Sequence, residues 1–423
     1  MLRVQTTTKE INSLKIHIAI EQSAISFDVM VLLSYILNNY SKKYPTASAM
    51  ARILINYELH TDVEINEVDD YYLIEFTYHY TDDDILNDCE YIYNDDNKTD
   101  IVEVLSFIKD NALSLPKNMN KILNRVKKML VETQYNLFER DDEKVFYSYF
   151  KNVNKDNINR NIFTRINGNN IFKLDTLDLM RAYKVLFDKG QFDISFSTAK
   201  VENQEKFLDF FDNTVFAKDN QYKVKKSFKK ALANAELFKF YDVKNVSDDY
   251  IFMEFNFLQM ESNLTNRLNW LFLEVLLDLP SISPLYNILR EREALIYGFQ
   301  LKRSLLYNRG IINFSIDNFN MIDKEIYFEI INAFENIELD LEVFEFIKRN
   351  ALAVLEELKN EPSLLDSFIY VLSVKENNQK INFDYVKEKI KNFEFFIFIE
   401  YLNSISFKRI RVFLGMDDEY EDY

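Results

Sequence analysis

The segment SPLYNILREREALIY, residues Ser283–Tyr297, has the spacing of an amphipathic helix. Within it, Arg290 and Tyr297 stand seven residues apart, close to two helical turns, so their side chains would share one face. A guanidinium and a phenol are hydrogen-bond donors that can hold a peptide backbone or a carboxylate. The simpler interpretation is a helix end with solvated charges, and the local pattern allows both.

The composition of the chain predicts two domains. Its 423 residues are 48% hydrophobic, which is enough to bury two substantial cores. The formal net charge is −17, from 51 basic and 68 acidic side chains, whereas a general nucleic-acid binder needs a basic surface for phosphate groups. We therefore expect no nucleic-acid partner, and a surface that favours encounters with basic peptides.

Cysteine use and hydropathy indicate a soluble, cytoplasmic protein. The single cysteine, Cys89, excludes an intramolecular disulfide and any metal site built from several cysteines. The N-terminal residues lack the charged and apolar regions of a signal peptide. Apolar runs such as Phe395–Ile399 are too short to span a bilayer, so we expect no membrane association.

Two stretches of the first half, Leu14–Ile20 and Tyr72–Tyr80, alternate as half-buried strands. The alternation puts polar residues on one face of each strand, among them Lys15, His17, Glu75 and His79. From Asn120 to Phe150 the pattern is helical and heavily charged, and it predicts one long helix. A further helical stretch lies near Leu364–Ser373.

The second half repeats the order of the first. Tyr44–Tyr80 and Pro280–Asp317 each contain a proline break, an amphipathic helix and two strands, and each follows an apolar helix. This repetition predicts an α+β fold with two homologous domains, each an antiparallel-rich sheet packed with helices. We place the N-terminal domain at residues 1–216, a linker at 217–235 and the C-terminal domain at 236–423. Lys218–Lys230 holds six lysines in thirteen residues, which fits a solvated linker or, alternatively, a docking strip for an acidic partner or leader.

Two fragments resemble the pitrilysin/insulinase metallopeptidases, the inverzincin family. The first is Val31–Tyr57, VLLSYILNNYSKKYPTASAMARILINY, in which a helix, Tyr-Pro-Thr and a second helix precede paired strands. The second is Ser283–Tyr297, which is similar to the family pattern S-x-L-F-x-x-[LV]-R-E-[KR]-x-x-L-x-Y. The resemblance is strongest to small bacterial members with one pair of domains per chain.

Active members of the family bind zinc through an H-x-x-E-H motif on the first helix. Counting back from Pro45 without gaps, the two histidine positions fall on Val31 and Tyr35, and the glutamate position falls on Ser34. Valine offers no ligand atom, and a neutral tyrosine and serine are poor substitutes for imidazole and carboxylate. We therefore expect no catalytic residues, metal or other cofactor in this chain.

The only histidines are His17, His60 and His79, and no two have helical metal spacing. We interpret them as surface or hydrogen-bonded histidines rather than as a displaced metal site.

Arg290 and Tyr297 match the positions that, in the family, hold the substrate carbonyl region opposite the zinc. The resemblance implies a non-catalytic subunit of a heterodimeric peptidase, with zinc in a homologous partner that carries H-x-x-E-H. The substrate would be an unfolded peptide, such as a bacteriocin or another modified peptide precursor. Two alternatives remain: a peptide- or protein-binding scaffold with no peptidase role, and an independent metalloenzyme with an atypical site.

Overall fold

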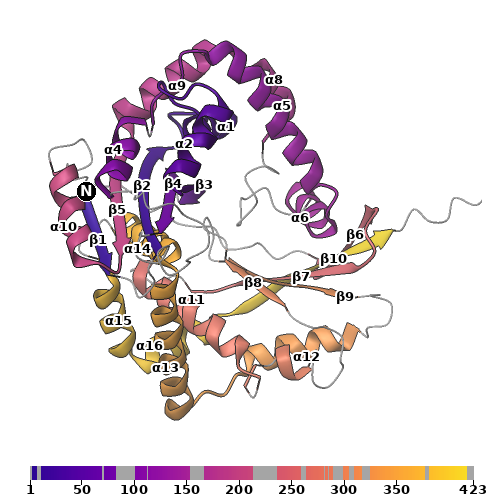
Figure 1. The fold of residues 1–423 in the computed structure, drawn as a ribbon. Coiled ribbons are helices and arrows are strands. Elements are labelled where there is room, and N and C mark those ends of the chain that lie inside the picture. The colour runs from indigo at the N-terminus through magenta and orange to yellow at the C-terminus, as the bar shows by residue number, and fades with distance from the viewer. Residues whose placement is uncertain are drawn as a thin grey trace, which may run out of the picture. The chain divides into compact units, whose positions relative to one another are not determined.

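The computed structural model describes residues 2–6, 11–68, 71–81, 101–111, 113–152, 166–212, 236–258, 263–280, 282–283, 285–288, 299–303, 309–316, 324–376 and 381–416. The contacts divide the chain into two compact units, each assembled from three segments. Unit 1 comprises Met1–Tyr135, Arg165–Lys225 and Glu356–Asn377, and unit 2 comprises Asn136–Thr164, Lys226–Leu355 and Asn378–Tyr423. Each unit combines one five-stranded sheet with helices, which confirms the predicted α+β fold (Figure 1).

Sheet 1, in unit 1, has the strand order β1-β5-β2-β4-β3. The β1 and β5 strands are parallel, and every other neighbouring pair is antiparallel. The strands are β1 (Leu2–Thr6), β2 (Ile11–Glu21), β3 (His60–Val68), β4 (Tyr71–Thr81) and β5 (Gln191–Thr198). The predicted strands Leu14–Ile20 and Tyr72–Tyr80 are therefore the cores of β2 and β4.

Several helices of unit 1 begin where polar caps satisfy their first backbone N–H groups. Asp175 and Asp178 form a reciprocal capping box at the start of α9, and the Thr46 hydroxyl accepts from the Ala49 N–H at the start of α2. The helices are α1 (Phe27–Asn39), α2 (Ala47–Asn56), α4 (Ile101–Asn111), α5 (Met119–Leu137), α8 (Gly168–Lys173), α9 (Thr176–Lys189), α10 (Val201–Phe211) and α14 (Pro362–Glu376), with a 3₁₀ turn at Leu358–Asn360.

Sheet 2, in unit 2, has the order β6-β10-β7-β9-β8, again with one parallel pair followed by antiparallel neighbours. Each strand takes the place of one strand of sheet 1, so the two sheets share one topology and the predicted duplication is confirmed. The strands are β6 (Phe238–Lys244), β7 (Asp249–Asn256), β8 (Gln300–Arg303), β9 (Arg309–Ile316) and β10 (Ser406–Met416). The helices are α6 (Asp141–Asn152), α11 (Asn263–Asp278), α12 (Lys324–Glu335), α13 (Leu341–Glu357), α15 (Phe383–Lys391) and α16 (Phe395–Asn403).

The two halves of the sequence exchange one helix each. Helix α6, from the first half, belongs to unit 2 and packs against β6, whereas α14, from the second half, belongs to unit 1 and packs against β2 and β5 (Figure 1). The prediction of one helix from Asn120 to Phe150 is wrong, because turns at Glu139 and Arg140 separate α5 from α6. Three acidic residues, Asp141, Asp142 and Glu143, then start the new helix, where negative charge is favourable.

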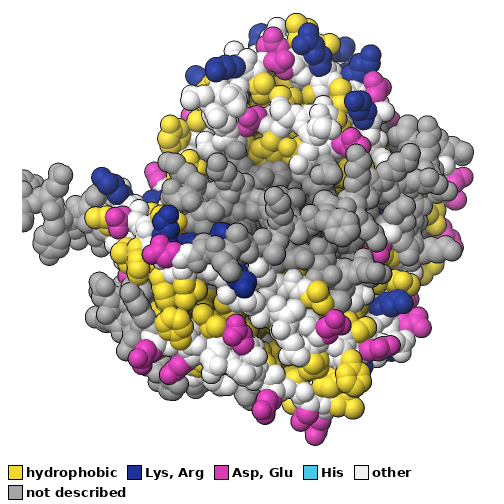
Figure 2. Space-filling view, turned by 180° about the vertical axis from the view of Figure 1, so that it is seen from behind, with side chains coloured by type: hydrophobic (Ala, Val, Ile, Leu, Met, Phe, Trp, Pro, Cys, Tyr) yellow, Lys and Arg dark blue, Asp and Glu magenta, His cyan; other side chains and the backbone are white. Residues whose placement is uncertain are grey.

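The described surface mixes charge signs. On the face drawn in Figure 2, acidic and basic side chains are interspersed with hydrophobic ones, as on a solvated surface. Of the helices that the structure describes, none combines the length and hydropathy needed to cross a membrane. The predicted linker, residues 217–235, lies outside the described residues, as does Cys89.

Candidate functional site

The three positions aligned with the zinc motif lie on helix α1. Val31 and Ser34 are buried, with 2% and 1% of their surfaces exposed, and Tyr35 is half-buried. Residues spaced i, i+3 and i+4 share one side of a helix, so the sequence brings these positions together as the family motif requires. Helix α1 packs against α8, α9 and β3, which makes it a central element of unit 1.

Tyr35 has a structural contact in place of a metal contact. Its hydroxyl donates to the sulfur of Met129 on α5, with 2.9 Å between Oη and Sδ. Burial raises the pKa of Tyr35 above its ordinary value of 10.0, nearby Tyr40 raises it further, and Arg125 opposes the rise. Tyr35 is therefore a neutral phenol at physiological pH, beside a cationic side chain.

The residues present do not fit a zinc ion. Val31 has no ligand atom, Ser34 is a neutral hydroxyl, and Tyr35 is occupied by a thioether and kept protonated. Within the described ranges, no group of three or more His, Cys, Asp or Glu side chains is arranged to hold a metal ion. Helix α1 therefore lacks the side chains that would hold a catalytic zinc ion at these positions.

Arg290 and Tyr297 lie outside the described residues, so their arrangement stays a prediction. The beginning of their segment is described: Leu285–Ile288 is helical and the Leu285 side chain is fully buried. The hydroxyl of Ser283, also buried, accepts from the Tyr286 backbone N–H at 3.2 Å, as an N-terminal cap does. The predicted helix therefore starts where the sequence places it.

The polar face of β2 and β4 is buried, contrary to the expectation of half-buried strands. Lys15, His17 and Glu75 are each exposed over 2% of their surface or less, because α14 covers this face. Lys15 Nζ lies 3.1 Å from Glu75 Oε2, and His17 Nε2 lies 2.9 Å from Ser195 Oγ on β5. Of the three histidines, His17 is thus a buried, hydrogen-bonded residue.

Helix α14 supplies polar residues to this face that the sequence interpretation did not single out. Asp366 accepts from Ser195 Oγ at 3.2 Å and from Ser197 Oγ at 2.9 Å, and it is 2% exposed. Ser367 takes part in the Lys15–Glu75 pair. A carboxylate within the apolar stretch Leu364–Ser373 was the signal that could have identified this helix as the cover of a polar surface.

Strand β3 is one of the two edge strands of sheet 1, and β1 is the other. Strand β3 pairs with β4 on one side, and no described strand pairs with its other side. Its side chains include Asp62 and Glu64, both exposed. Partial burial of the Glu64 carboxyl against the sheet and nearby Glu75 raise its pKa, while Lys15 opposes the rise. An extended peptide can add to such an edge through main-chain hydrogen bonds.

Known structures share this architecture over nearly the whole chain. A conserved protein from Enterococcus faecalis V583 matches with a TM-score of 0.69 and 14% identity, over 98% of this chain and 96% of that one. The inactive domain of an M16 peptidase from Pseudomonas fluorescens matches with a TM-score of 0.61 and 11% identity, over 98% and 95% of the two chains. Pitrilysin matches with a TM-score of 0.57 and 13% identity, over 98% of this chain and 43% of its own.

No model of a known protein family matches the sequence, and neither does any curated protein. The structural likeness nevertheless defines the class: the chain has the fold of the M16, pitrilysin-like peptidases, which confirms the resemblance seen in the sequence. More particularly, this M16-like fold carries Val31, Ser34 and Tyr35 on its first helix at the positions aligned with the zinc motif, and one of the solved structures that it resembles is described as an inactive M16 peptidase domain.

Proposed function

We propose that this chain is the non-catalytic subunit of a heterodimeric zinc peptidase that processes peptides. The observation that carries the proposal is the occupation of the motif positions on α1 by Val31, Ser34 and Tyr35, with the Tyr35 hydroxyl bonded to Met129. A scaffold of this fold that cannot hold zinc needs a partner for hydrolysis. The partner is a homologous chain with an intact H-x-x-E-H motif, and the zinc belongs to that subunit.

In this proposal Arg290 and Tyr297 form this chain's part of the active site. They hold the carbonyl region of the substrate opposite the partner's zinc, because a guanidinium and a phenol are fixed donors where negative charge develops on the carbonyl oxygen. The described cap at Ser283 and the helical turn Leu285–Ile288 support a helix over their segment.

The substrate in this proposal is an unfolded, basic peptide in the cytoplasm, such as a bacteriocin or another modified peptide precursor. The edge of β3 that no described strand covers supports binding by strand addition, and the exposed Asp62 and Glu64 on that strand favour cationic side chains. The net charge of −17 would increase the encounter rate with such peptides.

A second candidate is a peptide- or protein-binding scaffold with no peptidase role. It is favoured by the same occupation of α1 and by the structural likeness to an inactive M16 domain. The two candidates differ in one outcome only, which is proteolysis in the presence of a catalytic partner.

The test is reconstitution with a candidate partner that contains H-x-x-E-H, for instance a chain of similar length encoded by the neighbouring reading frame. We expect the purified chain alone to contain no stoichiometric zinc and to leave basic peptides intact, and the reconstituted pair to cleave them. Binding without cleavage by any pair would favour the scaffold instead. Stoichiometric zinc and cleavage by the chain alone would contradict both candidates and favour an atypical metalloenzyme.

A further inference from the structure

A layer of buried charges separates helix α14 from sheet 1. Four strands and the helix contribute to it: Arg3 from β1, Lys15 and His17 from β2, Glu75 from β4, Asp193 from β5, and Asp366 from α14. The side chain of Arg3 is 8% exposed and the other five residues are each exposed over 2% or less. Burying this many charges is costly unless each is paired, so the pairings decide how firmly α14 is held.

Two of the pairings join the helix directly to cations of the sheet. Lys15 Nζ lies 3.1 Å from Glu75 Oε2 and donates to the hydroxyl of Ser367 on α14, which in turn donates to Glu75. Arg3 donates to Ser373 Oγ at 3.2 Å.

The Tyr370 ring of α14 also contacts two residues of the layer. The Arg3 guanidinium lies 5.4 Å from the centre of the Tyr370 ring, and that ring stacks on His17 with 4.1 Å between centroids.

The third connection is a chain of hydrogen bonds from His17 to Asp366 through Ser195. His17 Nε2 and Ser195 Oγ are 2.9 Å apart, and Ser195 Oγ and Asp366 Oδ2 are 3.2 Å apart. At the other side of the imidazole, Nδ1 lies 3.7 Å from Glu75 Oε1. An ionised Glu75 favours a proton on Nδ1, so the Nε2 end of the ring is where protonation can change.

Ser195 has one hydroxyl proton, which allows two equivalent arrangements. When Asp366 is ionised, Ser195 donates to it and His17 Nε2–H donates to Ser195. When Asp366 is protonated, its proton is directed to Ser195, and Ser195 donates to an unprotonated Nε2. The two arrangements differ only in where one proton resides and in which way the Ser195 hydroxyl points.

This proton balances the charge of the layer. Arg3 and Lys15 bring two positive charges, and Glu75, Asp193 and Asp366 bring three negative ones when all are ionised. One additional proton, on His17 or on Asp366, makes the layer neutral, and its loss leaves one uncompensated negative charge in the interior. The rim of the layer holds three further titratable residues: Glu64 and Glu361 are exposed, and His79 is half-buried. Solvent screens their charges from the buried groups.

We propose that His17, Ser195 and Asp366 share one buried proton that locks helix α14 onto sheet 1, and that loss of this proton loosens the helix. Helix α14 comes from the second half of the sequence and belongs to unit 1. The shared proton therefore controls how firmly this segment is held in unit 1. Ser195, His17 and Glu75 are arranged in space like the Ser–His–acid triad of hydrolases. Ser195 is only 1% exposed, however, so no substrate reaches it.

The direction of the pH effect follows from Asp366. Burial raises the pKa of this carboxyl above its ordinary value of 3.8, and His17, Ser197, Lys15 and Ser195 oppose the rise. A raised pKa in the folded state means that stability is present at low pH and is lost as the pH rises through the folded value. Docking of α14 should therefore weaken toward alkaline pH.

The first test is hydrogen exchange of the α14 amides in the full chain, expressed as protection factors corrected for intrinsic exchange, from about pH 5 to about pH 9. In the wild type we expect α14 protection to fall by up to about tenfold per pH unit while the docked helix still holds the shared proton, and to level off once that proton is lost. Asp366→Asn should remove this fall, because a neutral amide replaces the protonated acid. Asp209→Asn, the same change on the exposed face of α10, should behave as the wild type. A pH-independent α14 in the wild type, or an equal fall in Asp366→Asn, would overturn the proposal.

A second measurement needs only the wild type. With three histidines in the chain, nitrogen NMR of labelled imidazoles gives one set of signals for each. We expect the His17 ring to carry a proton on Nδ1, the nitrogen that faces Glu75, and the hydrogen bond between Nε2 and Ser195 to change over the same pH range in which α14 loosens. A neutral His17 protonated on Nε2 and not on Nδ1 would contradict the proposed arrangement.

Discussion

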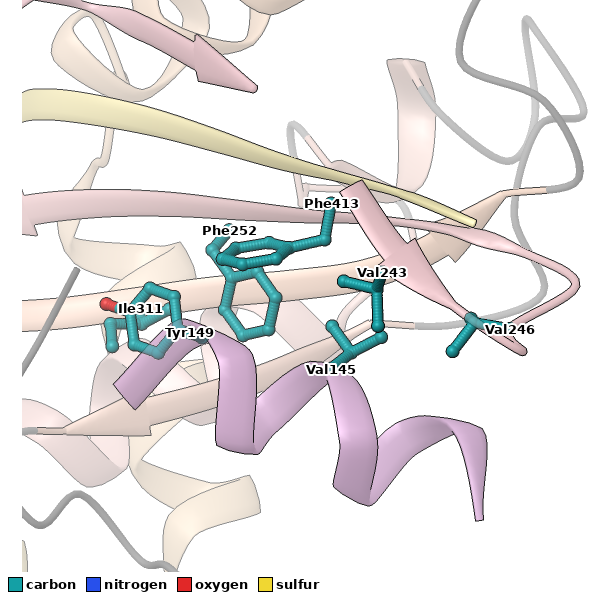
Figure 3. Packing of buried hydrophobic residues seen from close by; sticks show 7 residues of the cluster. All are labelled: Val145, Tyr149, Val243, Val246, Phe252, Ile311 and Phe413. Atoms are coloured by element: carbon teal, nitrogen blue, oxygen red, sulfur yellow. The ribbon is translucent and has the colours of Figure 1, made fainter. Parts of the chain in front are cut away.

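The exchanged helices α6 and α14 hold comparable positions on two sheets of one topology, yet their interfaces differ in chemistry, because α14 adds buried charges to its apolar contacts. Helix α6 packs Val145 and Tyr149 into an apolar cluster with Phe252 and Phe413 of sheet 2 (Figure 3). Helix α14 instead presents Asp366 and other polar groups to the charged face of sheet 1. The two units therefore share the exchange of a helix but differ in how that helix is held.

The difference separates two ways of attaching a helix. An apolar interface is stabilised by buried area and packing, neither of which responds to pH. A buried ionic interface contributes less net stability, but it is specific in geometry and depends on protonation. We therefore expect α6 to be a constant connection and α14 an adjustable one.

The largest effect should come from the apolar side. Phe252 stacks on Tyr149 with 4.4 Å between ring centroids and is fully buried, so Phe252→Ala should lower the free energy of unfolding by about 4 kcal/mol. Urea denaturation should give the same loss at acidic and at alkaline pH. The control Phe396→Ala removes a ring that is 79% exposed and should cost under about 1 kcal/mol. A loss in Phe252→Ala that varies with pH would show that the α6 interface is not purely apolar.

Glu75→Gln should be next in size and should depend on pH. Glu75 is fully buried, and although burial raises its pKa, hydrogen bonds and charge from His17, Lys15 and Ser367 outweigh that effect and lower it from 4.5 to about 2. A lowered pKa gives stability that is present above 4.5 and is lost as the pH falls toward about 2. The variant should therefore cost about 3 kcal/mol at neutral pH, and the deficit should shrink below about pH 4.5.

Glu205→Gln, on the exposed face of α10, provides the matched control and should change stability by less than about 0.5 kcal/mol. A deficit in Glu75→Gln that stays constant down to about pH 2 would mean that the carboxylate charge does not stabilise the α14 interface.

Ser367→Ala should have the smallest effect of the three on stability. The hydroxyl links α14 to both Lys15 and Glu75, and its removal leaves that ion pair intact while deleting the bridge to the helix. We expect a loss of about 1–2 kcal/mol, against less than about 0.5 kcal/mol for Ser23→Ala on an exposed turn. If Ser367→Ala equalled Glu75→Gln in cost, the bridge rather than the charge pair would hold the helix.

Local pattern in the sequence predicted much of the fold, because alternation and helical spacing are local properties. The apolar sides of β2 and β4 were predicted from Leu14–Ile20 and Tyr72–Tyr80. The burial of their polar sides was not, since the cover comes from distant sequence: Lys15 and Ser367 are 352 positions apart. The break between α5 and α6 was also missed, because charged residues continue the helical pattern through Arg140.

The site was predictable to a different extent. The positions Val31, Ser34 and Tyr35 followed from alignment of one fragment, and their places on α1 agree with the spacing of the motif. The bond from Tyr35 to Met129 could not be predicted, since it depends on how α5 packs against α1. The role of Asp366 could not be predicted either, because it depends on hydrogen bonds from Ser195 and Ser197 of β5, which are distant in the sequence.

The most direct test of the proposed function is the cleavage rate of the reconstituted pair with Arg290→Ala or Tyr297→Phe in this chain. If the two residues hold the substrate opposite the partner's zinc, each change should lower kcat by about 10²-fold while the pair still assembles. Arg292→Ala removes the same charge two residues away and should leave the rate within about twofold of the wild type. A pair that cleaves equally well after Arg290→Ala and Tyr297→Phe would contradict a contribution of this chain to the active site.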